Sequence, residues 1–358
     1  MAAAGSGQLR WLEECPKGTG GIGGKAAGLG EMLALGLRVP TGFVVTEAAY
    51  DAFRACSGLE AHLRELAALH GDRQWMSTVA ATLREHIEAT PLPALLVHEI
   101  SRACDELERR CGVEEFTVAV RSSASAEDLP GASFAGQQDT YLGVSRDGLV
   151  DAVRRCWASL FSERAVAYRA QMGFPLADVS IAVVVQKLVS ARASGVMFTM
   201  NPVTGNPFEV IIEANWGLGE SVVAGTVVPD RFVVSKHDCT LQRQLGEKTQ
   251  AAVVGPGGHR MIDLPPERQR EFCLTDAEVF ELARLGRLME QHYGEPRDVE
   301  WTADSELPFP ENVLLLQVRP VTTTGLGEWH CEQGKNATDH ILDVLIGKRF
   351  GGRGRAEA

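Results

Sequence analysis

Long apolar runs are missing from this 358-residue sequence. Its longest examples, Ile181 to Val185 and Val313 to Leu316, fall far short of the roughly 20 residues that span a bilayer. The first seven residues show no signal-peptide pattern. These absences predict a cytoplasmic protein without a membrane partner.

Basic charge and paired cysteines are also scarce. The 35 Lys and Arg face 47 Asp and Glu, and the net charge of -12 argues against nucleic acid as a partner. The eight cysteines include no Cys-x-x-Cys pair, so neither a zinc site nor a redox pair is indicated. The nine histidines lack metal-binding spacing, and we interpret them as structural or exposed. An anionic ligand must therefore be met by a few local Lys and Arg residues.

The patterning that is present predicts a helical first half and a β-rich second half. Helical spacing runs from Glu47 to Arg110, and one amphipathic helix is expected over Asp147 to Met172. Short β-runs separated by Gly, Pro and Asn begin at Ile181 and indicate a mostly antiparallel sheet. Residues 246–262 are expected to form a mobile loop.

We place the boundary between the two units near residue 178. The expected organisation is an N-terminal subdomain over 1–178, a C-terminal subdomain over 179–324, and a partly disordered tail over 325–358. Candidate ligand residues fall in both halves, which suggests a cleft between them.

A loop of small residues follows the β-run Phe116 to Val120. Arg121 lies where the strand meets the loop, and a planar guanidinium can hold phosphate oxygens bidentately. The loop's backbone N–H groups can point at an anion. The alternative is a Ser/Gly surface loop with a solvated Arg.

A second Gly-rich segment, Gly18 to Gly24, ends at Lys25. It is not a Walker A loop, because Ala26 follows the Lys where Ser or Thr is required. Either it is a flexible turn with a surface Lys, or Lys25 contacts a phosphate. Gln186, at the end of another β-run, can add a side-chain contact to an adenine, although an edge-strand Gln is the simpler interpretation of that segment alone.

Two expected strands near the end of the β-rich half carry polar residues with a spacing of two. Asp298 and Glu300 share one face, as do Gln317 and Arg319. Antiparallel pairing of these strands would bring a carboxylate and an amide oxygen to one Mg²⁺, which takes one or two carboxylates plus phosphates and waters. Arg319 would neutralise a phosphoryl group. The alternative is a charged surface pair.

Taken together, these segments resemble the nucleotide-binding part of the phosphoenolpyruvate synthase and pyruvate phosphate dikinase family, which has an ATP-grasp fold. The matching segments occur in family order over about residues 10–324 and are Gly23-Gly-Lys-Ala-Ala-Gly-Leu, Val39-Pro-Thr-Gly-Phe-Val-Val-Thr, Val120-Arg-Ser-Ser-Ala-Ser-Ala-Glu-Asp, Phe134-Ala-Gly-Gln-Gln-Asp-Thr, Gly195-Val-Met-Phe-Thr-Met-Asn-Pro, Glu213-Ala-Asn-Trp-Gly-Leu-Gly-Glu, Asp298-Val-Glu-Trp and Leu316-Gln-Val-Arg-Pro. Each segment alone is weak, but the set is specific.

The resemblance implies an α+β protein with ATP and Mg²⁺ held between two ATP-grasp subdomains. The implied roles are phosphate binding by Lys25, Arg121 and Arg319, with Arg121 and Arg319 catalytic, a covering loop with Gly136 and Thr140, adenine contact by Gln186, and magnesium binding by Glu300 and Gln317.

Family members continue with a swivelling domain that carries a phosphorylated His in a Thr-Ser-His-Ala-like motif, and a further domain binds the acceptor. This sequence has no such motif, since His330 lies in Trp-His-Cys and His340 in Asp-His-Ile. We therefore expect a separate partner subunit to carry the phospho-His domain and the acceptor site. ATP would pass its pyrophosphoryl group to that His, with release of AMP and phosphate.

A nucleotide-binding subunit of this size resembles that of phenylphosphate synthase, which implies phenol as the final acceptor. Three alternatives remain open: the subunit of a split phosphoenolpyruvate synthase-like enzyme, a fragment of a rifampicin-type phosphotransferase, and a module that senses ATP without turnover. The retention of the phosphate and metal residues as a set argues against the sensing module.

Overall fold

Two antiparallel sheets form the framework of the protein. The computed structural model describes residues 7–67, 73–112, 117–124, 139–172, 179–255 and 258–321. The first sheet contains, in spatial order, β1 (Leu9–Trp11), β2 (Gly42–Val45), β5 (Ile181–Lys187), β3 (Val118–Ala124) and β4 (Thr140–Val144). The second contains β13 (Val313–Pro320), β12 (Arg297–Asp304), β6 (Ala191–Phe198), β7 (Glu209–Trp216), β8 (Asp230–Ser235) and β9 (Leu241–Gln244). The expectation of an α+β protein with antiparallel sheets is confirmed.

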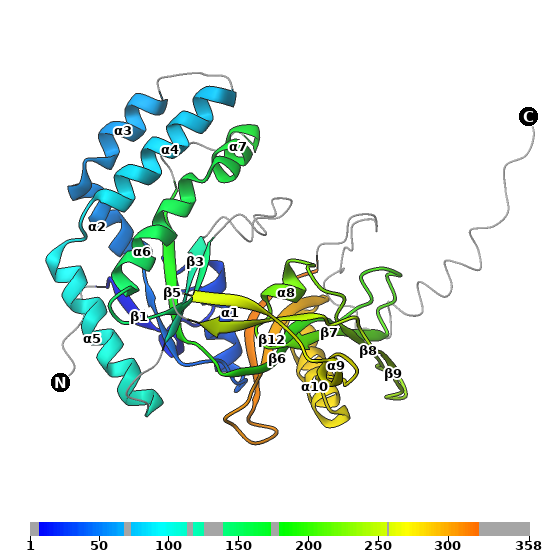
Figure 1. The fold of residues 1–358 in the computed structure, drawn as a ribbon. Helices are drawn as coiled ribbons and strands as arrows, with labels where there is room; N and C mark the ends of the chain where they lie inside the picture. Colours follow the sequence, from blue (N-terminus) through cyan, green and yellow to red (C-terminus); the bar gives the residue numbers. More distant parts are fainter. Residues whose placement is uncertain are drawn as a thin grey trace, which may run out of the picture.

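One face of the first sheet is covered by helices (Figure 1). They are α2 (Glu47–Ser57), α3 (Leu59–Ala67), α4 (Arg73–Ala89), α5 (Ala94–Cys111), α6 (Leu149–Ala158), the short 3-10 helix η3 (Ser159–Phe161) and α7 (Glu163–Met172). Strand alternation explains this layer, because Phe43 and Val45 face the helices while Val44 faces the other way. None of the helices in the described part of the chain combines the length and apolar character that crossing a bilayer requires.

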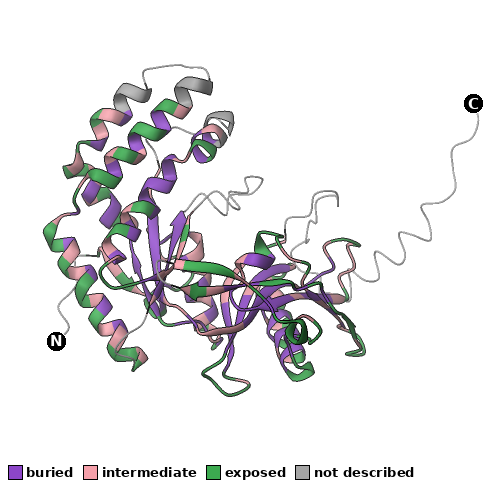
Figure 2. Cartoon of the chain, viewed as in Figure 1, coloured by how far each residue is buried: buried purple, intermediate pink, exposed green. Residues whose placement is uncertain are grey.

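The other face of the first sheet packs on α1 (Gly23–Ala34), which follows the short 3-10 helix η1 (Leu12–Glu14). Ala26, Leu29 and Met32 of α1 belong to one core that also includes Trp301 and Leu315 of the second sheet. Helix α10 (Asp276–Tyr293) joins this core from the second sheet's side, and α8 (Glu220–Val223) and α9 (Pro266–Gln269) lie nearby. Figure 2 shows the buried residues concentrated in both sheets.

The structure corrects two expected segments. The single helix predicted over Asp147 to Met172 is interrupted after α6, because Ser162 caps a new helix by accepting a hydrogen bond from Ala165 N at 3.2 Å. Residues 246–262, expected as a mobile loop, instead contain a hairpin of β10 (Gln250–Gly255) and β11 (Gly258–Asp263).

Strand β5 lies inside the first sheet, hydrogen-bonded to β2 and β3. The boundary expected near residue 178 therefore separates β5 from the sheet to which it belongs. Its side chains are apolar on both faces, as a central strand covered on both sides requires. The division into two subdomains stays a prediction, and the connection between the sheets runs through residues 188–190.

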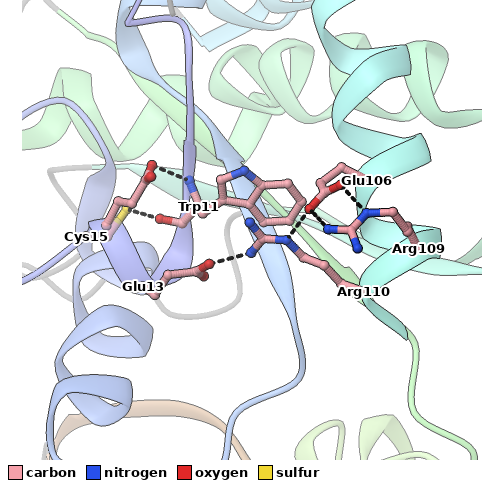
Figure 3. A network of polar contacts seen from close by, with 7 residues as sticks. Trp11, Glu13, Cys15, Glu106, Arg109 and Arg110 are labelled. Atoms are coloured by element: carbon pink, nitrogen blue, oxygen red, sulfur yellow. Dashed lines mark hydrogen bonds and ion pairs between the residues drawn. The ribbon is translucent and has the colours of Figure 1, made fainter. Parts of the chain in front are cut away.

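The N-terminal strand is fastened to the end of α5 by charged and aromatic side chains (Figure 3). The guanidinium of Arg110 lies 3.6 Å from the centre of the Trp11 ring and bonds to Glu13. Glu106 accepts hydrogen bonds from Arg109 Nε at 2.7 Å and Arg110 Nε at 2.9 Å. The bonds from Arg109 and Arg110 lower the pKa of Glu106 to about 2. This network anchors β1 at the edge of the first sheet.

Candidate nucleotide site

A cleft of about 1670 Å³ opens between the two sheets. Its walls include seven of the eight site residues expected from the sequence, namely Lys25, Arg121, Thr140, Gln186, Glu300, Gln317 and Arg319. The eighth, Gly136, lies outside the described residues. The first four come from the first sheet or α1 and the other three from the second sheet, so the site exists only where the two sheets face each other.

Arg121 spans this cleft. It lies on the buried strand β3, opposite Val184 of β5 and Thr140 of β4. Its Nη1 donates to Leu316 O at 2.7 Å, and its Nη2 donates to Glu300 Oε2 and Gln317 Oε1, both at 2.9 Å. The expected phosphate ligand is thus hydrogen-bonded to the two expected metal ligands. In this arrangement it ties the first sheet to the second.

Glu300 and Gln317 are direct partners on the antiparallel strands β12 and β13. The pairing agrees with the prediction that these strands bring a carboxylate and an amide oxygen together. Both oxygens converge on one atom, Arg121 Nη2. Oxygen donors of this kind fit Mg²⁺, which needs few protein ligands beside phosphate oxygens and water. Among the described residues no group of three or more His, Cys, Asp or Glu could hold a metal, so any metal here would depend on this pair and its ligand.

Asp298 is a neighbour of the site that we did not expect among its functional residues. It pairs in register with Arg319 and accepts a hydrogen bond from Arg319 Nε at 2.7 Å. Burial raises the pKa of the Asp298 carboxyl, and the charge of Arg319 opposes this shift. Asp298 therefore orients the guanidinium of Arg319 at the wall of the cleft. The sequence signal for this role was the spacing of two between Asp298 and Glu300, which places both carboxylates on the same face of the strand.

Lys25 lies in the first turn of α1, which agrees with the expectation that the Gly-rich run leads into a helix. The start of α1 is attached to β3 through Ser123, whose Oγ donates to Ile22 O at 3.0 Å and accepts from Ala26 N at 3.2 Å. Because Ser123 is two residues from Arg121, this attachment places both cations on the same side of the cleft. The Gly-rich run before Lys25 predicted this residue as a candidate phosphate ligand. It did not predict that Ser123 attaches the start of α1 to β3.

Gln186 and Thr140 line the cleft with different surroundings. Gln186 is buried at the end of β5, where its Nε2 donates to Pro40 O at 3.0 Å. One donor of the side-chain amide is therefore used within the protein, and residues 187–189 beside it also line the cleft. The adenine contact of Gln186 stays a prediction. Thr140 is exposed on β4, where it pairs with Arg121 of the neighbouring strand β3.

Two cleft residues, Glu220 and His259, were missed. His259 lies on β11 and its Nε2 is 2.7 Å from Glu220 Oε2 of α8. Burial raises the pKa of the Glu220 carboxyl, and His259 opposes this shift. His259 is exposed, as predicted from the sequence, but it also lines the cleft. The sequence signal for the hairpin that carries His259 was the pair of β-runs on either side of Gly255 to Gly258.

Comparison with known proteins gives a family match and several relatives. A model of the pyruvate phosphate dikinase AMP/ATP-binding domain matches residues 20–338. The phosphoenolpyruvate synthase of Aeropyrum pernix is 42% identical over 345 residues, which cover 88% of this chain and 42% of that protein. A probable phosphoenolpyruvate synthase of Archaeoglobus fulgidus is 44% identical over 333 residues, 91% of this chain and 42% of that protein.

The chain thus spans less than half the length of these relatives. A further probable phosphoenolpyruvate synthase, from Staphylothermus marinus, repeats the pattern with 42% identity over 364 residues, 93% of this chain and 43% of that protein. The family match extends over all strands of both sheets except β1 and over every described residue that lines the cleft. The chain belongs to the family of pyruvate phosphate dikinase AMP/ATP-binding domains.

Proposed function

We propose that this chain binds Mg-ATP in the cleft between its sheets and transfers the pyrophosphoryl group of ATP to a histidine. The observation that carries the proposal is the meeting of three cations, Lys25, Arg121 and Arg319, with a carboxylate and an amide oxygen at the wall of one cleft. Family membership supports the nucleotide. Two antiparallel sheets with the cleft between them support an ATP-grasp fold.

The side chains would bind and orient the triphosphate. Lys25 and Arg319 supply positive charge from opposite walls, and Asp298 holds the guanidinium of Arg319 in place. Arg121 lies beside both oxygen ligands, from which its guanidinium can turn to phosphate oxygens. Glu300 and Gln317 would hold Mg²⁺, which neutralises phosphate charge and polarises the phosphoryl group when bound.

In the proposed reaction, an imidazole nitrogen attacks the β-phosphorus of ATP. The bond between that phosphorus and the oxygen bridging to the α-phosphate breaks, and AMP leaves with the oxygen. Water then cleaves the γ-phosphate from the pyrophosphoryl-histidine, which releases inorganic phosphate and leaves phospho-histidine. The cationic residues of the cleft stabilise the charge that develops on the transferred group.

We further propose that the histidine belongs to a separate subunit, as the resemblance to the two-chain phenylphosphate synthase implies. Phenol is the final acceptor that we propose from the resemblance to the nucleotide-binding subunit of phenylphosphate synthase. Pyruvate is the second candidate, and the naming of the relatives as phosphoenolpyruvate synthases favours it. Either acceptor would bind outside the cleft described here.

The decisive experiment follows label from β-³²P-ATP in the chain together with partners purified with it from its native cell. We expect label on a histidine of another polypeptide, AMP formation, and little ATP hydrolysis by the chain alone. Phenol or pyruvate should then remove the label, which separates the two acceptors. Rapid turnover of ATP without any partner would contradict the external histidine.

Arg319→Ala tests the cleft itself. We expect this variant to abolish AMP formation in the reconstituted system while its circular dichroism spectrum stays like that of the wild type, which shows an intact fold. Arg284→Ala is the matched control, because Arg284 is exposed on α10 and pairs there with its helix neighbour Glu281. AMP release at the wild-type rate by Arg319→Ala would rule out the proposed role.

A further inference from the structure

We propose that Glu220 is the residue that recognises the ribose hydroxyls of the nucleotide, and that His259 positions its carboxylate. This inference rests on the proposed binding of ATP in the cleft and adds a specificity-determining residue to it. Both side chains line the cleft, from α8 and from the hairpin of β10 and β11. Neither side chain has a part in phosphate or metal binding as proposed above.

The residue pairing between β6 and β12 of the second sheet defines how far apart positions lie along the cleft. Ala191 pairs with Asp304 next to the connection from the first sheet, where we place the adenine. Val196 pairs with Glu300, where the metal and phosphates belong. A strand advances about 3.3 Å per residue, so these two positions are about 16 Å apart. The ribose of a nucleotide bound along this line would lie between them.

Helix α8 begins beside this intermediate position. Ser194 lies between Ala191 and Val196 on β6 and pairs with Thr302. Gly219, directly before α8, packs on it, because a Cβ placed on Gly219 would lie 3.5 Å from Ser194 Cβ and 3.8 Å from Gly195 N. The next residue is Glu220, which therefore enters the cleft at the level expected for the sugar and not at the level of the phosphates.

A carboxylate suits the ribose and not the neighbouring groups. Ionised Glu only accepts hydrogen bonds, and the ribose 2′- and 3′-hydroxyls are donors, so the two are complementary. Beside the phosphates the same charge would be repelled. Loss of a hydrogen bond to a charged acceptor weakens binding by about tenfold or more, which is enough to distinguish a ribonucleotide from a deoxyribonucleotide.

The hairpin holds His259 against this carboxylate. Its first strand is attached to the segment before α8, since Leu218 N donates to Ala252 O at 2.8 Å and Asn215 Nδ2 donates to Gln250 O at 2.9 Å. At its tip, Gly258 packs so closely on β4 that a Cβ on Gly143 would lie 2.7 Å from Gly258 O. The hairpin is thereby fixed at both sheets, and His259 Nε2 stays 2.7 Å from Glu220 Oε2. We assign the other oxygen, Oε1, to the ligand.

The test is calorimetric titration of the full chain with Mg-ATP, Mg-2′-deoxy-ATP and Mg-3′-deoxy-ATP. We expect the wild type to bind ATP at least about tenfold more tightly than one or both deoxy analogues. Glu220→Ala should bind all three nucleotides alike, at the affinity that the wild type has for the weaker analogue. His259→Ala should reduce the preference in part and leave deoxynucleotide binding unchanged.

Glu271→Ala, an exposed residue outside the cleft lining, is the matched control and should keep the wild-type preference. If Glu220→Ala is unfolded, Glu220→Leu, which also lacks an acceptor, replaces it, with the same loss of preference expected. A preference for ATP that survives in the folded Glu220 variant overturns the inference, as does a wild type without any preference. Absence of ATP binding in the wild type would instead contradict the proposed function itself.

Discussion

At the residue scale, Gly23 determines how closely α1 approaches β3. Its backbone has φ +71°, and a Cβ at this position would lie 2.0 Å from Ser123 O. Only glycine meets both conditions, because other residues rarely adopt this φ and none can occupy that space. The close approach is what lets Ser123 bond to Ile22 O and Ala26 N and so places Lys25.

We therefore predict that Gly23→Ala lowers the free energy of unfolding by about 3 kcal/mol, from backbone strain plus overpacking, and weakens Mg-ATP binding. Gly36→Ala is the control, since Gly36 follows the other end of α1 with φ +73° and has no atom within 4 Å of its Cβ position. Gly36→Ala should lower the free energy of unfolding by about 1 kcal/mol, from backbone strain alone, and leave Mg-ATP binding unchanged. Urea unfolding and calorimetric titration measure both quantities. Equal losses in the two variants would argue against the contact with Ser123.

At the scale of elements, the start of α10 is joined to β6 and to the loop before β13 through one buried carboxylate. Glu278 accepts hydrogen bonds from Thr275 N at 2.9 Å and from Asn312 Nδ2 at 2.8 Å, and it forms an ion pair with Arg192. Burial acts to raise its pKa, but these partners together lower the pKa of Glu278 below its ordinary value. Helix α10 thereby supports the second sheet beneath β12 and β13.

The lowered pKa fixes the sign of a pH dependence. The stabilisation by Glu278 is present above the pKa of an unfolded Glu, about 4.3, and is lost as the pH falls through the lower pKa of the folded state. We predict that Glu278→Gln costs about 1.5–3 kcal/mol of unfolding free energy at pH 7 and that this difference shrinks below pH 4. Urea unfolding of both proteins at pH 7 and pH 3 measures it.

Asp276→Asn provides the comparison for Glu278. Asp276 lies in the same first turn of α10, is exposed, and pairs with the partly exposed Arg243. An exposed pair contributes little because water screens it, so this variant should unfold nearly like the wild type at pH 7. A loss at pH 7 in Glu278→Gln that stays unchanged at pH 3 would contradict the ionised role of Glu278.

At the scale of the whole molecule, the two sheets share a core. One cluster of buried side chains includes Val44 and Val184 of the first sheet, Leu29 of α1, and Trp301 and Leu315 of the second sheet. Helix α1 therefore has an apolar surface toward each sheet. Separating the sheets would expose these surfaces to water, at about 25 cal/mol per Å².

We predict from this shared core that the protein unfolds in a single cooperative transition. Scanning calorimetry should give a calorimetric enthalpy equal to the van't Hoff enthalpy, and circular dichroism should follow the same curve as tryptophan fluorescence. Saturating Mg-ATP should raise the midpoint temperature of this single transition without splitting it, because the proposed ligand contacts both sheets. Two resolved transitions would mean that the sheets unfold independently.

Much of the site could be predicted from local pattern. Glu300 and Gln317 were expected together because a spacing of two fixes the face of a strand and adjacent strands in an antiparallel sheet pair directly. The position of β5 was not predictable in this way, because a strand apolar on both faces carries no sign of which sheet it will join. The bond between Arg121 and the two oxygens joins residues almost 200 positions apart, beyond any local signal.

The amino-acid sequence alone determined the kind of ligand that we propose for this protein, since the types and spacings of its Lys, Arg, Glu and Gln residues suit phosphate and a metal ion. The tertiary structure decided which of these groups meet and which others join them. Asp298 and His259 acquire their roles only when strands distant in the chain become neighbours. The physical reason is that charge and hydrogen-bonding capacity belong to each residue, whereas distance and burial belong to the folded chain.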